Sequence, residues 1–77
     1  MKKIGIALFA TLRKGRSDLA DKGFVMTKAV TIGELLEEIH ITDTDAASVF
    51  VNDKRAGHGT ELQDGDKVSI FPLLGGG

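Results

Sequence analysis

The residues most suited to take part in a chemical reaction are the last five: Leu73, Leu74, Gly75, Gly76 and Gly77. A run of glycines can thread a narrow channel that any Cβ atom would block, and it can adopt backbone angles closed to other residues. A free carboxylate on Gly77 would therefore be accessible to another enzyme. We interpret residues 73–77 as a flexible tail that presents this carboxylate for modification, with a frayed terminus or an expression-tag remnant as the alternative.

The composition predicts one small domain and excludes several function classes. A chain of 77 residues buries only about 60% of its unfolded surface. Without cysteine it has neither a disulfide nor a thiolate metal site. Ten basic and eleven acidic residues give a net charge of -1, which argues against a nucleic-acid partner. Because the sequence shows no membrane span and no signal peptide, we expect a cytoplasmic protein without a membrane partner.

The first part of the chain predicts two strands joined by a polar loop. Apolar residues alternate through residues 4–10, which is the period of a strand. Residues 11–23 are mostly polar and predict a loop that ends at Gly23. Residues 24–30 predict the second strand, so the two strands are expected to form a hairpin.

A helix is predicted to begin after Thr31. Thr31 and Glu34 have the spacing of a capping box, in which their polar groups satisfy backbone N–H groups of the first turn. Apolar residues follow at helical spacing on one face: Ile32, Leu35, Leu36 and Ile39. The helix is predicted to end near His40, which we interpret as a structural residue.

The second part of the chain predicts two further strands, residues 48–51 and 67–71. A short edge strand is possible within residues 54–60. A tight turn is predicted before the last strand, with Gly65 free to adopt a positive φ. Pro72 has no N–H to donate and therefore ends the strand pairing. One helix on one face of a mixed sheet would bury these apolar faces, which is an α+β fold.

Five short motifs occur in order along the chain. They are residues 8–13 (LFATLR), residues 31–36 (TIGELL), Val51-Asn52, residues 62–68 (LQDGDKV) and the terminal Gly76-Gly77. Together they resemble the MoaD/ThiS-type ubiquitin-like sulfur carriers over the whole chain. The resemblance implies a ubiquitin-like β-grasp domain in residues 1–72, with a mixed sheet of four to five strands and one main helix packed on one face. Residues 73–77 would form the glycine tail.

Within this family the pattern is closest to the small subunit of molybdopterin synthase. Phe71-Pro72 near the end and Arg13 shortly after Phe9 are similar to that branch. Gly75 stands where that branch commonly has alanine, and three terminal glycines also occur in the sulfur carriers of thiamine biosynthesis. The resemblance therefore implies molybdenum or tungsten cofactor synthesis, with thiamine thiazole synthesis as the alternative.

The resemblance also implies the chemistry of Gly77. An E1-like activating enzyme would use ATP and magnesium to adenylate its carboxylate, and sulfur from a sulfur-transfer protein or desulfurase would then form a thiocarboxylate. The acceptor would be a synthase, either the large subunit of molybdopterin synthase or thiazole synthase. The chain itself would bind no cofactor and would act as a sulfur-donor cosubstrate or synthase subunit without catalytic residues of its own.

Docking residues are predicted from strand parity and from the resemblance. Phe9 and Phe71 have the opposite parity to the inward-facing residues of their strands, and an exposed apolar patch commonly marks an interface. The predicted partner-binding residues are Phe9, Arg13, Phe71, Pro72, Leu73, Leu74, Gly75 and Gly76. The two phenylalanines could instead cover a small cluster under residues 11–23, and Arg13 could belong to a merely solvated basic loop with Lys14 and Arg16.

Metal binding and intrinsic catalysis are not predicted. His40 and His58 are distant in sequence, and Asp43 and Asp45 lack the remaining ligands of a calcium loop. No nucleophile–histidine–carboxylate arrangement can be identified. Two other classes remain open, because a protein modifier joined to lysine would need the same two glycines and a passive interaction domain would not need the tail.

Overall fold

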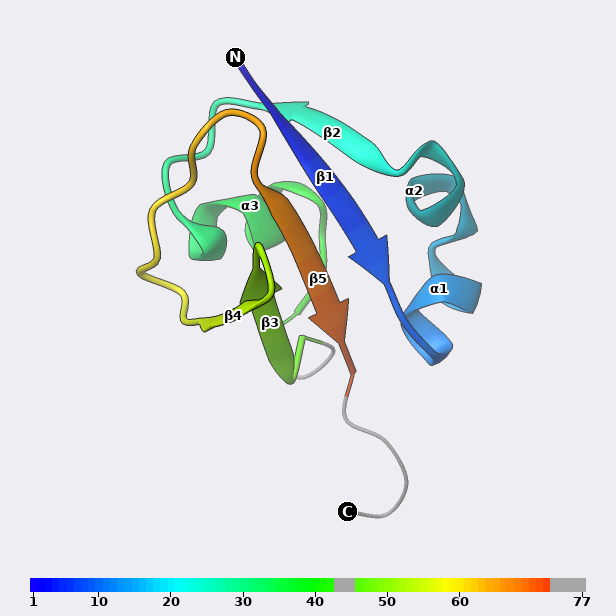
Figure 1. The fold of residues 1–77 in the computed structure, drawn as a ribbon. Helices are drawn as coiled ribbons and strands as arrows, with labels where there is room; N and C mark the ends of the chain where they lie inside the picture. The colour runs from blue at the N-terminus through cyan, green and yellow to red at the C-terminus, as the bar shows by residue number, and fades with distance from the viewer. Residues whose placement is uncertain (43–45, 73–77) are drawn as a thin grey trace.

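A computed structural model describes residues 1–42 and 46–72 of the chain. Five strands form one sheet in the order β2-β1-β5-β3-β4. The strands are β1 (Lys2–Leu8), β2 (Phe24–Thr27), β3 (Ser48–Val51), β4 (Lys54–Ala56) and β5 (Lys67–Phe71). The helices are α1 (Thr11–Gly15), α2 (Ser17–Lys22) and α3 (Ile32–Glu38). Figure 1 shows α3 behind the sheet, with α1 and α2 beside the β1–β2 side.

The two central strands, β1 and β5, are parallel, whereas every other pair is antiparallel. Their register pairs Gly5 with Lys67 and Leu8 with Ile70. The carboxyl ends of β1 and β5 therefore lie at the same end of the molecule (Figure 1). This mixed sheet with its main helix on one face is the predicted α+β, β-grasp architecture, and the short edge strand β4 is also confirmed.

The core lies between α3 and the inner face of the sheet. Alternate residues of β1 are buried, as the period of two predicts, whereas in β5 Val68, Ser69 and Ile70 are all buried. The buried apolar side chains of β1, β5 and α3 are Ile4, Ile6, Leu8, Val68, Ile70, Ile32, Leu35 and Leu36. Because these apolar residues of β1 and β5 occupy the inner face of the sheet, the residues between them lie on the outer face.

Both ends of α3 are stabilised by local hydrogen bonds. At the start, the Oγ1 atom of Thr31 accepts a bond from the Glu34 N–H at 3.3 Å, as the capping box predicts. At the end, His40 has a φ of 61°. The Ile41 N–H donates to the Leu36 carbonyl at 2.9 Å, which is the long bond of a Schellman motif. His40 therefore ends the helix through its backbone conformation, consistent with the structural role predicted for it.

The predicted loop at residues 11–23 is wrong, because this segment forms the two short helices α1 and α2. Leu12 and Leu19, at 8% and 6% exposure, bury one side of the segment against the core. Leu12 and Leu19 are seven residues apart, which is the spacing of two helical turns. The charged residues between them obscured this pattern in the sequence. The strands predicted over 4–10 and 24–30 also end earlier, at Leu8 and Thr27. Their antiparallel pairing is confirmed.

The remaining turns use residues suited to positive φ. Asn52 and Asp53 have φ values of 51° and 70°, the geometry of a tight type I′ hairpin between β3 and β4. Gly65 has a φ of 90° before β5, as predicted. Among the described residues, none of the helices combines the length and hydropathy needed to cross a membrane.

Candidate partner-docking site

Phe9 and Phe71 form the centre of the candidate site. Their ring centroids lie 4.2 Å apart and their planes are inclined by 7°, so the rings are stacked. The parallel register that pairs Leu8 with Ile70 places these two residues next to each other, one position further along each strand. The predicted pair is therefore assembled by the sheet at the end where β1 and β5 both finish.

Phe50, on β3, is a third aromatic residue of this site, and it was not predicted from the sequence. Its ring meets that of Phe71 edge to face, with centroids 5.6 Å apart and an interplanar angle of 82°. Phe50 pairs with Ser69 in the antiparallel β3–β5 ladder, so it lies diagonally across from Phe71. Its alternation with the buried Val49 was the available signal. We call Phe9, Phe50 and Phe71 the aromatic patch.

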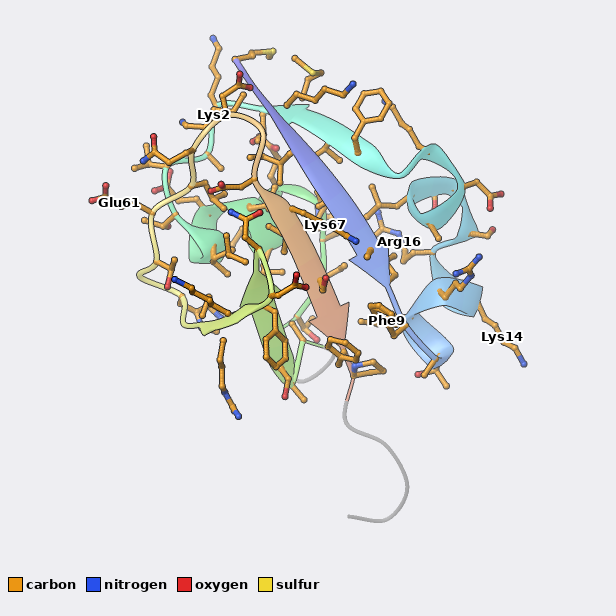
Figure 2. The ribbon with its side chains drawn as sticks, viewed as in Figure 1. Lys2, Phe9, Lys14, Arg16, Glu61 and Lys67 are labelled. Atoms are coloured by element: carbon orange, nitrogen blue, oxygen red, sulfur yellow. The ribbon has the colours of Figure 1, made fainter. Side chains whose placement is uncertain are left out.

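The aromatic patch borders a shallow hollow of about 310 Å³, which is also lined by Asp53, Lys67 and Ser69. Phe9 is 37% exposed, and none of the three rings belongs to the buried core. Figure 2 shows Phe9 and Lys67 on the side of the sheet turned away from α3. The outward orientation disagrees with the alternative in which the phenylalanines cover a buried cluster, whereas the docking role itself stays a prediction.

The three basic residues predicted to share a loop have different surroundings. Arg13 is exposed on α1, a helix that begins two residues after Phe9. Arg16 instead donates a hydrogen bond to the Ile39 carbonyl at the end of α3, and its Nε atom lies 3.7 Å from the Asp18 carboxylate. Lys14 extends away from the domain (Figure 2). Arg13 therefore remains a candidate docking cation, whereas Arg16 has a structural contact.

Pro72 directly follows β5 and is half-buried at the end of the sheet that carries the aromatic patch. The other predicted tail residues, Leu73, Leu74, Gly75, Gly76 and Gly77, lie outside the described residues, as do Asp43 and Asp45. Within residues 1–42 and 46–72, no three His, Asp or Glu side chains are grouped to hold a metal ion. The described part of the predicted docking surface therefore consists of the aromatic patch, Arg13 and Pro72.

The comparisons with known proteins agree with this architecture. The model of the ThiS family matches residues 6–77, and the chain therefore belongs to the ThiS family. It is a ubiquitin-like sulfur carrier of the MoaD/ThiS type, a class that implies an E1-like activating enzyme and a synthase as partners in general. A search of curated proteins found no match.

Solved structures that are similar to this one include two proteins, from Pyrococcus furiosus and Haloferax volcanii. The first is a putative molybdopterin converting factor, subunit 1, from Pyrococcus furiosus, with 25% sequence identity and a TM-score of 0.67. The match covers 96% of this chain and 100% of that protein. The second is the solution structure of the Haloferax volcanii HVO 2177 protein, with 24% identity, a TM-score of 0.70, and coverage of 99% and 87%. The second likeness supports the fold alone.

Proposed function

We propose that this sulfur carrier works as a thiocarboxylate on Gly77 and donates its sulfur in molybdopterin synthesis. The observation that supports this most directly is the position of the aromatic patch at the end of β5, immediately before residues 73–77. Five residues beyond Pro72 span at most about 18 Å when extended. A partner that binds the aromatic patch could therefore hold Gly77 within reach of its own active site.

The proposed chemistry takes place on the activating enzyme. The carboxylate of Gly77 attacks the α-phosphate of ATP, which forms an acyl adenylate and releases pyrophosphate. A persulfide then attacks the acyl carbon and releases AMP, which leaves an acyl disulfide. A thiol cleaves the S–S bond, so that the thiocarboxylate and a new disulfide are formed. The tail supplies the acyl group, and the folded domain supplies the binding surface.

Two features support molybdopterin as the destination. Phe9, Arg13 and the Phe71-Pro72 pair are similar to the small subunit of molybdopterin synthase. The likeness to the Pyrococcus furiosus protein, described as a molybdopterin converting factor subunit, supports the same branch. Thiamine thiazole synthesis is the second candidate, which Gly75 and the ThiS family match favour.

The experiment is an intact-mass measurement after incubation with the activating enzyme, ATP, magnesium and a persulfide donor. We expect the mass to increase by the difference between one sulfur and one oxygen atom, with the change located at Gly77. A variant lacking Gly77 should keep its fold and fail to gain sulfur. Equal sulfur transfer by this shortened variant would refute the proposal.

The acceptor is identified by supplying the thiocarboxylated chain to two enzymes in parallel. Conversion of the precursor by the large subunit of molybdopterin synthase would support the first branch, whereas product from thiazole synthase alone would support the second. A protein-modifier function predicts covalent adducts on lysine after incubation with target extract. Adducts without any sulfur transfer would replace the carrier proposal with the modifier alternative.

A further inference from the structure

We propose that the outer face of the sheet carries a second, cationic docking surface that binds an acidic segment of a partner polypeptide. Its basic residues come from three elements: Lys3 on β1, Lys22 on α2 and Lys67 on β5. Phe24 at the start of β2 lies among them. We call these four residues the cationic patch. The proposal concerns binding alone and does not depend on sulfur transfer.

Two ammonium groups converge on one aromatic ring in this patch. The Nζ atom of Lys3 lies 4.6 Å from the centroid of the Phe24 ring, and that of Lys22 lies 5.2 Å from it. The ring quadrupole attracts both cations. Two like charges held near one ring also repel each other, and an anion placed beside them would relieve this repulsion.

The two nearby carboxylates, Asp64 and Asp66, are oriented by hydrogen bonds from neutral N–H donors. The Oδ1 atom of Asp64 accepts a hydrogen bond from the Lys3 backbone N–H at 2.7 Å. Asp66 accepts one bond from the Asn52 side-chain amide at 2.9 Å and another from the Gln63 N–H at 2.8 Å. Within the described part of the chain, the ion pair found joins Arg16 and Asp18 and involves none of the three patch lysines. Both carboxylates keep their negative charges, and Asp66 lines the same groove as Lys3 and Lys67. Among the described residues, however, neither carboxylate forms an ion pair with a patch lysine, so the ammonium groups can pair with a partner's carboxylates.

A groove of about 410 Å³ lies beside the patch and is lined by Lys3, Phe24 and Lys67, with Asp66 as its one acidic residue. Gly5 forms part of its floor, where β1 carries no side chain. Lys67 also lines the hollow beside the aromatic patch, so the two surfaces adjoin each other on the outer face. Figure 2 shows Lys67 in the middle of this face.

The geometry favours an acidic chain segment over a small anion. The three lysines are exposed and lie on separate elements, and flexible lysine side chains act as separate point charges rather than as a rigid phosphate cradle. Lys3 lies near the start of β1, about 20 Å along the strand direction from Phe9. A partner polypeptide that crosses the sheet could therefore contact both the cationic patch and the aromatic patch.

The test is a titration of the 15N-labelled protein with end-blocked hexaglutamate, in which the NMR chemical shifts of the backbone amides are measured. We expect the largest shifts at Lys3, Phe24 and Lys67, and no matching shifts with hexaglutamine. Replacing both Lys3 and Lys22 by glutamine should weaken binding about tenfold, since two exposed charge pairs are lost. The Lys67→Gln variant should also weaken binding. Added salt should weaken hexaglutamate binding because exposed charges are screened.

The matched control replaces Lys28 and Lys54 by glutamine, which removes two exposed charges away from the groove. This variant should bind hexaglutamate as the original protein does. Equal weakening in both double variants would overturn the proposal, because binding would then reflect total charge. Saturable binding of inorganic phosphate at the same amides without hexaglutamate binding would overturn it in favour of a small-anion site. Since the titration does not involve Gly77, its failure would leave the sulfur-carrier proposal unaffected.

Discussion

The rings of Phe9 and Phe71 stack at the common end of the two central parallel strands, with centroids 4.2 Å apart. These residues come from opposite ends of the chain, and only the β1–β5 pairing brings them together. Phe50 joins them from β3. The aromatic patch is thus a product of the sheet, located where the chain leaves β5 toward Gly77.

Replacing Phe71 by alanine should impair binding to the activating enzyme more than folding. Because Phe71 is only half-buried, we expect a loss of about 1–2 kcal/mol in unfolding free energy, below the roughly 3–5 kcal/mol of a fully buried phenylalanine. Binding should weaken by about 2 kcal/mol or more, as for an interface hot spot. Urea unfolding and calorimetric titration measure the two quantities.

The control for that substitution is Val30→Ala, at an exposed apolar residue between β2 and α3, outside both proposed docking surfaces. It should leave affinity for the activating enzyme nearly unchanged. If Phe71→Ala instead unfolded the protein, the ring would have to be reassigned to the core. Unchanged affinity in the folded variant would remove Phe71 from the docking surface.

Arg16→Met and Arg13→Met should have opposite consequences. Arg16 bonds the Ile39 carbonyl at the end of α3, so its loss should lower the unfolding free energy by about 1 kcal/mol or somewhat more. Arg13 is exposed, and its replacement should lower partner affinity while leaving the denaturation midpoint unchanged. The unfolding free energy of both variants is measured with urea, and their affinity for the activating enzyme is measured by titration. A destabilised Arg13→Met with unchanged binding would contradict the assignment.

Asn52 should contribute to stability through both its backbone and its side chain. Its φ is 51°, its Oδ1 atom accepts a bond from the Lys67 N–H at 3.0 Å, and its amide donates to Asp66 at 2.9 Å. Asn52→Gly should lose the side-chain bonds but keep the turn, whereas Asn52→Ala should be about 1 kcal/mol less stable than the glycine variant. Thermal unfolding of both variants measures the difference, and equal stability would show that the turn conformation is not strained.

Ala10→Gly should stabilise the protein. Ala10 has a φ of 54° and a ψ of -130°, a combination that is unfavourable for a residue with a Cβ atom. Relief of this strain should exceed the added unfolded-state entropy of glycine, so we expect a gain of about 1 kcal/mol. Chemical denaturation measures it. A lower midpoint in the glycine variant would indicate that Ala10 is relaxed.

Much of the fold could be predicted from local patterns. The alternation in β1 and β5, the capping pair at Thr31 and the turn at Gly65 were all identified, because each depends on residues close together in sequence. The helices α1 and α2 were missed. Short helices gain their stability mainly from packing, and Leu12 and Leu19 become a helical face only once the core is there to cover them.

The candidate site was likewise predicted only in part from the sequence. By itself the sequence determined the family motifs, the absence of cysteine, the glycine-rich end and the outward parity of Phe9 and Phe71. Only the tertiary structure decided that these two rings stack and that Phe50 contacts Phe71. It also decided that Arg16 donates to the Ile39 carbonyl and that the ammonium groups of Lys3 and Lys22 both lie near the Phe24 ring. Strand order and register depend on contacts between distant parts of the chain, which no local pattern of residues specifies.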